Sequence, residues 1–198
     1  MFLETIRIEH AQPQLLDRHY ARMCRSARRA GIPEIPYPAF LSSIGSAVER
    51  HVDGNPARFK LRMQYAAEIQ AIDVQRYNPR AVTAVVLCTA DELEYGSKFS
   101  DRGALDRYQE LLGPRAIALY VKHGLLTDLW YANVVLRRGG VWYTPAVPLL
   151  GGVMREHLLA ESRATDDGRC GRFPVREADI PAADTANFEV LSPINAML

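Results

Sequence analysis

Lysine is scarce in this chain. Of the 24 lysines and arginines in 198 residues, three are lysine: Lys60, Lys98 and Lys122. Because arginine serves wherever a positive charge alone is needed, a lysine here is a candidate for chemistry that arginine cannot perform. A neutral amine can attack an aldehyde carbonyl and form an imine, whereas a guanidinium stays protonated and non-nucleophilic.

Lys98 is the strongest candidate of the three. It lies between an apolar strand-like run and a helical segment, a type of junction that presents side chains to a cleft. The alternative is a solvated surface charge in a chain whose low lysine content reflects codon usage. Lys60 alternates with apolar residues, as a solvent-facing strand residue does. Lys122 precedes His123 and Gly124 in an expected turn.

An excess of charge of one sign is also lacking. The net charge is +1, and the arginines are mixed with acids, so no nucleic-acid-binding face is indicated. The three cysteines, Cys24, Cys88 and Cys170, share no metal-like spacing and fit free thiols in a reducing compartment. No run approaches the roughly 20 apolar residues needed to cross a bilayer, and the N-terminus lacks the pattern of a signal peptide. We expect a cytoplasmic protein with no metal site and no membrane partner.

The hydrophobic patterning predicts a mixed α+β protein. With 48% hydrophobic residues, the chain can form one domain or two small lobes. Period-two alternation and helical spacing predict the following elements in the first half: strands at 2–8, 58–66, 69–77 and 81–88, and helices at 13–29 and 38–50.

The second half of the chain also contains both predicted helices and predicted strands. The expected elements are helices at 102–112 and 153–162, strands at 116–121, 132–137 and 141–144, turns at 123–124 and 139–140, and an exposed loop at 164–171. Residues 188–198 are expected to form a strand that Pro193 interrupts or confines to a sheet edge. We expect a smaller N-terminal α/β lobe at residues 1–96 and a C-terminal lobe at residues 97–198.

A possible phosphate-binding loop is the second chemical signal. Gly151 and Gly152 directly precede the helix expected at residue 153, and they would leave its first N–H groups unobstructed. The alternative is a plain turn. Arg22 follows the apolar face of the first helix and could add a phosphate contact, or be an ordinary surface arginine. Asp128 leads into an aromatic and apolar run; its alternative role is that of a cap or turn carboxylate.

Six segments resemble the sequence motifs of one known family and follow one another in the same order as in that family. They are Phe-Leu-Glu-Thr-Ile-Arg at 2–7, His-Tyr-Ala-Arg at 19–22, Lys-Phe-Ser-Asp-Arg at 98–102, an Asp-x4-Asn-Val strand at 128–134, Thr-Pro followed by Leu-Leu-Gly-Gly-Val-Met-Arg at 144–155, and Asn-Ala at 195–196. Together they resemble the class IV aminotransferases, pyridoxal phosphate enzymes of fold type IV. The segment at 98–102 and the ending at 195–196 resemble the short members similar to 4-amino-4-deoxychorismate lyase.

The resemblance implies a D-amino-acid aminotransferase-like fold with pyridoxal 5'-phosphate between two small α/β lobes. Lys98 corresponds to the Schiff-base lysine, which becomes the proton-carrying base once the substrate amine has displaced it. Arg22 and the backbone N–H groups of Val153 and Met154 would bind the phosphate, and Asp128 would keep the ring nitrogen protonated. Asn133, Asn195 and Ala196 complete the implied cofactor-binding set. The family also implies a homodimer.

Three departures from the family pattern affect the substrate side. The chain starts at the Phe-Glu-Thr strand, without the strand that longer members place before it. Asp128 stands where Glu is usual, so its shorter reach requires the ring or the strand to lie closer. Met154 stands where Thr is common, which keeps the backbone N–H and loses a hydroxyl.

Several activities therefore remain open. A lyase would eliminate pyruvate from an amino-cyclohexadiene carboxylate such as 4-amino-4-deoxychorismate and leave 4-aminobenzoate, as in folate biosynthesis; Asn195, Ala196 and the short length favour it. An aminotransferase of the D-amino-acid or branched-chain type would use the same lysine and electron sink. A non-catalytic homologue or a partner-binding module is the third possibility, since fold does not settle function. The presence of Lys98 in so lysine-poor a chain argues against it.

Overall fold

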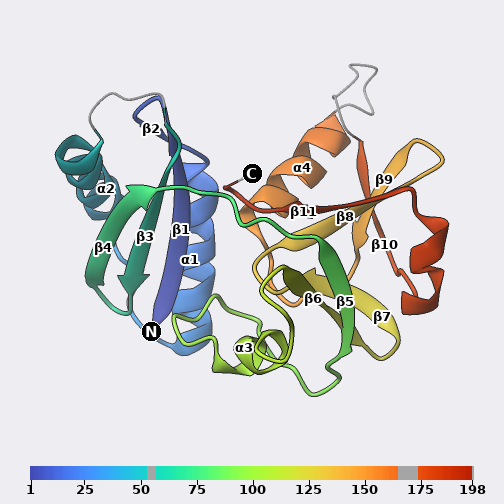
Figure 1. Ribbon diagram of the computed structural model, residues 1–198. Helices are drawn as coiled ribbons and strands as arrows, with labels where there is room; N and C mark the ends of the chain where they lie inside the picture. The colour runs from blue at the N-terminus through green and yellow to red at the C-terminus, as the bar shows by residue number, and fades with distance from the viewer. Residues whose placement is uncertain (53–56, 165–173, 198) are drawn as a thin grey trace. The chain divides into compact units, whose positions relative to one another are not determined.

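The computed structural model describes residues 1–52, 57–164 and 174–197. Within this part the chain forms two compact units (Figure 1). The first comprises residues 1–79, 97–101 and 197, and the second comprises residues 80–96 and 102–196. This division differs from the boundary expected between residues 96 and 97. The loop predicted at 164–171, apart from its first residue, and Cys170 lie outside the described residues.

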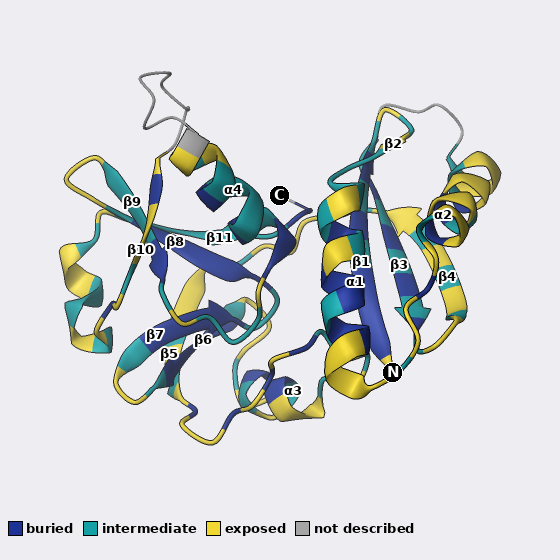
Figure 2. Ribbon diagram, turned by 180° about the vertical axis from the view of Figure 1, so that it is seen from behind, coloured by how far each residue is buried: buried dark blue, intermediate teal, exposed yellow. Residues whose placement is uncertain are grey.

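A four-stranded antiparallel sheet organises the first unit. Its strand order is β2-β1-β3-β4, with the bounds β1 Phe2–Glu9, β2 Gln12–Pro13, β3 Phe59–Tyr65 and β4 Ile69–Arg76. Side chains alternate along β1 and β3, so that Ile6, Ile8, Leu61 and Met63 are buried on one face. Figure 2 shows this buried face beneath the helices of the unit. The strands predicted at 2–8, 58–66 and 69–77 are confirmed.

Two helices cover that buried face. α1 (Leu16–Ala30) and α2 (Tyr37–His51) share one hydrophobic core with the sheet. The helix predicted from residue 13 begins later, because β2 pairs with β1 and Leu15 adopts a left-handed backbone with a φ of 56°. α1 ends at Gly31, whose φ of 64° is one that glycine adopts without strain.

Residues 98–100 form an additional edge to β1. Leu3 N–H donates to the Lys98 carbonyl (2.8 Å), and Ser100 N–H donates to the Met1 carbonyl (3.1 Å). Phe99 is directly opposite Phe2, and the two rings stack at a centroid distance of 5.5 Å. These contacts explain why this short segment belongs to the first unit although its flanking residues belong to the second.

The second unit contains two sheets. One has the order β5-β6-β7 and the other β10-β9-β8-β11. The strands are β5 Ala84–Thr89, β6 Ala116–Lys122, β7 Leu125–Leu129, β8 Asn133–Arg138, β9 Val141–Pro145, β10 Val175–Ala178 and β11 Val190–Ile194. The helices are α3 (Gly103–Gln109), α4 (Val153–Ala164) and the 3-10 helix η1 (Ala182–Asn187). The turns predicted at 123–124 and 139–140 are confirmed, with positive φ at all four residues.

Three strands, β2, β7 and β10, were not predicted. β2 has two residues, and β7 and β10 are short and carry polar residues that break the apolar alternation. β11 contains Pro193 and lies at a sheet edge, as predicted for a strand with a residue that cannot donate a ladder hydrogen bond. Among the described residues, no helix is long and apolar enough to span a membrane.

Candidate active site

Glu4 is a carboxylate in the hydrophobic core of the first unit. It lies on the face of β1 that also carries Ile6 and Ile8. Its Oε1 accepts a hydrogen bond from Arg22 Nε (2.9 Å), and its Oε2 contacts Arg22 Nη2 (2.5 Å) and His19 Nδ1 (2.6 Å). The side chains of Glu4 and His19 are fully buried, and that of Arg22 is 7% exposed. Arg22 is therefore not an ordinary surface arginine, because Glu4 holds its guanidinium inside the fold.

The charges of neighbouring residues and burial together shift the pKa values of Glu4 and His19. Burial raises the pKa of Glu4, but the neighbouring Arg22 and His19 outweigh burial and leave the pKa at about 2. Burial lowers the pKa of His19 against the opposing effect of Glu4, and the charges of Arg22 and Lys98 lower it further. A neutral His19 beside an ionised Glu4 must donate through Nδ1–H, which leaves a lone pair on Nε2. Nε2 is buried and has no hydrogen-bond partner within the described residues.

Lys98 is fixed to the strand that carries this cluster. Its carbonyl accepts from Leu3 N–H, one residue before Glu4, and its charge acts on His19. Lys98 is half-buried. Lys122, by contrast, donates to the Leu93 carbonyl (2.6 Å) and to Glu94 (2.9 Å), so its role is structural.

Asp128 is the buried acid of the second unit. It lies in β7, not in the cap or turn that was the alternative, and is 5% exposed. Its Oδ1 accepts from Asn133 Nδ2 (2.7 Å) and its Oδ2 from Leu150 N–H (2.9 Å). Asn133 Nδ2 also donates to the Leu150 carbonyl (2.9 Å). Burial raises the pKa of Asp128 to about 7, although these hydrogen bonds oppose the rise.

Asn133 also explains one of the two glycines in the loop before α4. A Cβ added to Gly152 would lie 1.8 Å from Asn133 Oδ1 and 3.0 Å from its Cγ, so no side chain fits there. α4 begins at the next residue, Val153. Its first hydrogen bond runs from Glu156 N–H to the Gly152 carbonyl (2.9 Å), so the N–H groups of Val153 and Met154 precede the helical ladder.

Arg155 anchors the start of α4. Its Nη2 donates to the Pro145 carbonyl (2.8 Å) and to Glu177 Oε1 (2.7 Å), and its side chain is 8% exposed. The helix start is thus tied to the ends of β9 and β10, whereas Asn133 and Asp128 fix the loop before it. The loop is held from both sides by buried polar contacts.

The predicted residues fall into one group in each unit. Arg22 and Lys98 belong to the first unit, with Glu4 and His19. Asp128, Asn133, Val153 and Met154 belong to the second, together with Asn195 and Ala196, which follow β11. The sequence did not predict that Glu4, His19, Leu150 and Gly152 position the other residues of the two groups. A signal for Glu4 existed, because it is a charged residue at a core position of an alternating strand.

A family model described as "Amino-transferase class IV" matches residues 1–198. The chain belongs to this family. A protein of Haemophilus influenzae named "Uncharacterized protein" is 28% identical over 195 residues, which is 98% of this chain and 96% of the relative. The resemblance inferred from the six sequence segments is confirmed, and the chain is a member of a family of pyridoxal phosphate-dependent enzymes.

Solved structures show the same fold. A candidate 4-amino-4-deoxychorismate lyase from Haemophilus somnus matches with a TM-score of 0.81 and 24% identity, over 99% of this chain and 95% of that one. A candidate amino-acid aminotransferase from Mesorhizobium loti matches with a TM-score of 0.74 and 25% identity, over 99% and 94%. The pyridoxal phosphate-bound form of a hypothetical aminotransferase from Mycobacterium tuberculosis matches with a TM-score of 0.80 and 18% identity, over 99% and 77%. The predicted fold type IV is confirmed.

Proposed function

We propose that this enzyme binds pyridoxal 5'-phosphate through Lys98 and acts on a small amino compound, in a lyase reaction of the 4-amino-4-deoxychorismate type. The observation that carries the proposal is the attachment of Lys98 to β1. Its carbonyl is hydrogen-bonded one residue before Glu4, which holds Arg22 and a neutral His19. One of the three lysines of the chain is therefore attached, through its backbone, to the strand that carries a buried network of charged groups.

The residues present fit this cofactor. In the second unit, the N–H groups of Val153 and Met154 at the start of α4 suit a phosphate, and Gly152 before them leaves no room for a side chain. In the first unit, the guanidinium of Arg22 suits the same chemical group. A pyridine ring nitrogen would be matched by Asp128, a buried carboxyl whose pKa lies well above that of an exposed aspartate. The cofactor carries an aldehyde, a phosphate and a basic ring nitrogen. The aldehyde requires a lysine amine, the phosphate an arginine or a helix N-terminus, and the ring nitrogen a buried acid.

When bound, the cofactor supplies an aldehyde that condenses with amines and a protonated ring that accepts the electrons of a broken bond at the substrate carbon. Asp128 would hold the proton of the ring nitrogen. Its buried position favours this role, because an ionised Asp128 in the core is stabilised once a positive partner is present. Asn133 and Leu150 N–H would keep the carboxylate oxygens oriented.

Lys98 would move the protons. Once the substrate amine has taken its place, its free Nζ accepts the proton from the carbon that bears the amine. Neutral His19 adds no positive charge beside this base, whereas a protonated His19 would oppose reprotonation of Lys98. Glu4 would act at a distance by keeping His19 in one tautomer and Arg22 in one orientation.

The lyase is the first candidate. In it, Lys98 Nζ would remove the ring proton at the amine-bearing carbon, the bond to the enolpyruvyl oxygen would break, and the returned proton would give pyruvate and 4-aminobenzoate. The Asn195-Ala196 ending and the similarity to the Haemophilus somnus protein over nearly the full length of both chains support it. This activity would place the enzyme in folate biosynthesis.

The aminotransferase is the second candidate. The observation that favours it is the similarity to the Mesorhizobium loti protein, a candidate amino-acid aminotransferase, which this chain matches over 94% of that protein's length at 25% identity. Here Lys98 Nζ would carry the proton from the substrate α-carbon to the cofactor carbon, and hydrolysis would release an oxo acid. Both candidates use the same base, so the products distinguish them.

The test begins with the attachment of the cofactor. The protein is incubated with pyridoxal phosphate, reduced with borohydride, digested and analysed by mass spectrometry. We expect the label on Lys98, no label in Lys98→Arg, and an unchanged label in the controls Lys60→Arg and Lys122→Arg. Absence of a label on Lys98 in the wild type would leave the non-catalytic homologue as the interpretation.

The second step measures products. Release of 4-aminobenzoate and pyruvate from 4-amino-4-deoxychorismate, lost in Lys98→Arg, would establish the lyase. Formation of pyridoxamine phosphate from D- or L-amino acids, without these products, would establish the aminotransferase.

We also propose a cytoplasmic homodimer. β5 is an edge strand, and its Val85 and Leu87 are 41% and 44% exposed; such an apolar edge favours association with another chain. Sedimentation equilibrium should give twice the chain mass of 22.2 kDa, and a monomer mass at micromolar concentration would contradict the proposal.

A further inference from the structure

A turn of three residues joins Asp128 to Asn133 in the second unit. β7 ends at Leu129, directly after Asp128, and β8 begins at Asn133. Leu129 N–H donates to the Ala132 carbonyl (2.8 Å), and Ala132 N–H donates to the Leu129 carbonyl (3.3 Å), so the turn is closed by two backbone hydrogen bonds. The conformation of residues 130–132 therefore helps to set the hydrogen bond of 2.7 Å between Asn133 Nδ2 and Asp128 Oδ1.

Trp130, the first residue of this turn, is held by its backbone and by its ring. Its N–H donates to the Ala118 carbonyl of β6 (2.9 Å). Its indole Nε1–H donates to Asp106 Oδ1 of α3 (2.7 Å), and its side chain packs against two hydrophobic cores of the second unit. Trp130 therefore attaches the turn to the rest of this unit.

Arg102 contacts Trp130 at both its carbonyl and its ring. Its Nη2 donates to the Trp130 carbonyl (2.5 Å), and its guanidinium carbon lies 5.4 Å from the centroid of the Trp130 ring. Its Nε lies 3.7 Å from Asp106 Oδ1, the oxygen that accepts from the indole. A planar guanidinium can stack on an aromatic ring and donate from its edge at the same time. One side chain, 22% exposed, thus holds Trp130 at two places.

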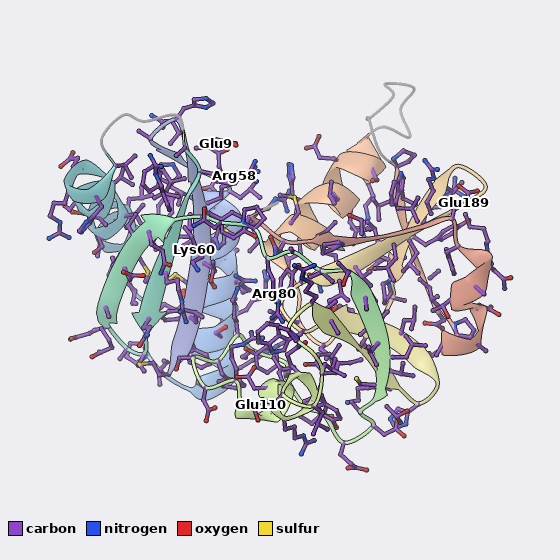
Figure 3. The ribbon with its side chains drawn as sticks, in the orientation of Figure 1. Glu9, Arg58, Lys60, Arg80, Glu110 and Glu189 are labelled. Carbon is purple, nitrogen blue, oxygen red and sulfur yellow. The ribbon has the colours of Figure 1, made fainter. Side chains whose placement is uncertain are left out.

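Arg80 provides a comparison, because it contacts the same ring in a different way. Its guanidinium carbon lies 5.2 Å from the centroid of the Trp130 ring, and its Nη2 donates to the Pro114 carbonyl (2.8 Å). Within the described residues, it forms no hydrogen bond with the turn. Figure 3 labels Arg80 before β5 and Glu110 at the C-terminal end of α3. Arg80 therefore stacks on the ring, whereas Arg102 also holds the backbone of the turn.

We propose that Arg102 is a positioning residue for Asp128: by holding Trp130, it keeps the turn at residues 130–132 closed and the Asp128 carboxyl in its buried place. The inference rests on the proposed function where it connects Asp128 with the ring nitrogen of the cofactor. It goes beyond that function, because it gives a role to a residue outside the predicted cofactor-binding set. Arg102 would act through Trp130.

The sign of one shift distinguishes positioning from a direct effect of charge. Burial raises the pKa of Asp128 to about 7. If the turn opens when Arg102 is removed, water reaches the carboxyl and its pKa falls toward the ordinary value. If Arg102 acted on Asp128 only as a nearby positive charge, its removal would raise the pKa instead.

The experiment uses the full chain without cofactor and four variants: Arg102→Gln, Arg102→Lys, Arg80→Gln and Arg107→Gln. Arg102→Lys keeps the charge and a donor but loses the planar fork. Arg107→Gln is the matched control, because Arg107 also belongs to α3 and stacks on an aromatic ring, that of Tyr108, at 4.8 Å. Arg80→Gln removes a cation from the Trp130 ring and leaves the bond to its carbonyl.

Two properties are measured by nuclear magnetic resonance. Hydrogen exchange of the Leu129 and Trp130 N–H groups reports whether the turn is closed, since both groups are hydrogen-bonded there. The carboxyl carbon signal of Asp128, assigned with Asp128→Asn, gives the midpoint of its titration.

We expect Arg102→Gln to speed the exchange of both N–H groups about tenfold and to leave the β8–β9 ladder unchanged. It should lower the Asp128 midpoint by about one pH unit, a tenfold change in proton affinity. Arg102→Lys should give intermediate values, and Arg80→Gln and Arg107→Gln should change neither property by more than about twofold. Unchanged exchange, an equal increase at all amides, or a midpoint that stays or rises in Arg102→Gln would overturn the proposal.

A fluorescence titration with pyridoxal phosphate separates this proposal from the proposed function. Arg102→Gln should weaken cofactor binding about tenfold, because Asp128 is displaced. A wild type that takes no label on Lys98 would contradict the proposed function, and the cofactor-free measurements would still decide the role of Arg102. If the midpoint of Asp128 fell and cofactor affinity stayed the same, the positioning role would be upheld and the assignment of Asp128 to the ring nitrogen would fail.

Discussion

Arg22 and Glu4 form a two-point ion pair inside the first unit, with Nε–Oε1 and Nη2–Oε2 distances of 2.9 and 2.5 Å. The pair fixes the plane of the guanidinium, because two parallel contacts allow one orientation. Its burial also means that neither partner can be removed without leaving the other charge uncompensated. The arginine expected to bind the cofactor phosphate is therefore positioned by the core before any ligand is present.

Glu4→Gln should be strongly destabilising. An amide cannot balance the charge of Arg22, so we expect the free energy of unfolding to fall by about 3 kcal/mol and the affinity for pyridoxal phosphate to fall with it. The control is Glu9→Gln, since Glu9 pairs with Arg58 near the surface at 31% exposure, where an ion pair contributes less than about 1 kcal/mol. Urea unfolding measures both, and similar losses in the two variants would contradict the buried pair.

Lowering the pH should remove the contribution of Glu4 to the free energy of unfolding. The folded pKa of about 2 lies below the ordinary value of 4.5. Its stabilisation is therefore fully present above pH 4.5 and is lost as the pH falls toward 2. The difference in unfolding free energy between wild type and Glu4→Gln should shrink across this window, and a constant difference would show that the carboxylate is not ionised in the fold.

Asp128→Asn should flatten the pH dependence of the cofactor-free protein. The folded pKa of about 7 lies above the ordinary 3.8. The stability associated with the protonated carboxyl is thus present at low pH and is lost as the pH rises through 7. The variant has no such loss, although its amide presents a donor where Asn133 and Leu150 both need acceptors, which costs about 1–3 kcal/mol at every pH.

Unfolding at pH 5 and pH 8, with and without pyridoxal phosphate, tests this expectation. The wild type should lose stability between the two pH values more than the variant does, and added cofactor should stabilise the wild type more at pH 8. A variant with the same pH slope as the wild type would show that Asp128 does not titrate in this range.

Gly152→Ala should disturb the loop before α4. The new Cβ would overlap Asn133 Oδ1 at 1.8 Å, and Asn133 cannot turn away without losing its contacts to Asp128 and Leu150. We expect a loss of about 2 kcal/mol of stability and at least a tenfold loss of pyridoxal phosphate affinity.

Gly113→Ala is the control for that variant. No heavy atom lies within 4 Å of a Cβ added to Gly113, so its effect should stay within about 0.5 kcal/mol. Thermal unfolding and a fluorescence titration with pyridoxal phosphate measure both properties. Unchanged cofactor affinity in Gly152→Ala would separate this loop from the phosphate site.

Much of the fold was predictable because local periodicity and burial agree. β1 and β3 alternate between apolar and polar residues, and each buries its apolar set against the helices. β7 was not predictable in this way. Its residues 126–129 are all buried, so the strand shows no alternation, and its Asp128 looked like a turn residue.

For the candidate site, residue type and resemblance pointed to Lys98, Arg22, Asp128 and the Gly151-Gly152 loop, and their role in binding the cofactor stays a prediction. The structure adds the contacts of Arg22 and Asp128. The role of Glu4 required the structure, because its partners Arg22 and His19 are 18 and 15 residues away in the chain. A buried carboxylate is tolerated only where such partners converge, and sequence spacing does not record that convergence.

The sequence by itself determined the family, most elements of the first unit and the lysine to be tested, since these depend on residue type and on periods of two and 3.6. Only the tertiary structure decided that Glu4 holds Arg22 and His19 in the core, and that Asn133 excludes a side chain at Gly152. These relationships arise from strand register and from packing between segments far apart in the chain, and register is fixed when the whole sheet and core assemble.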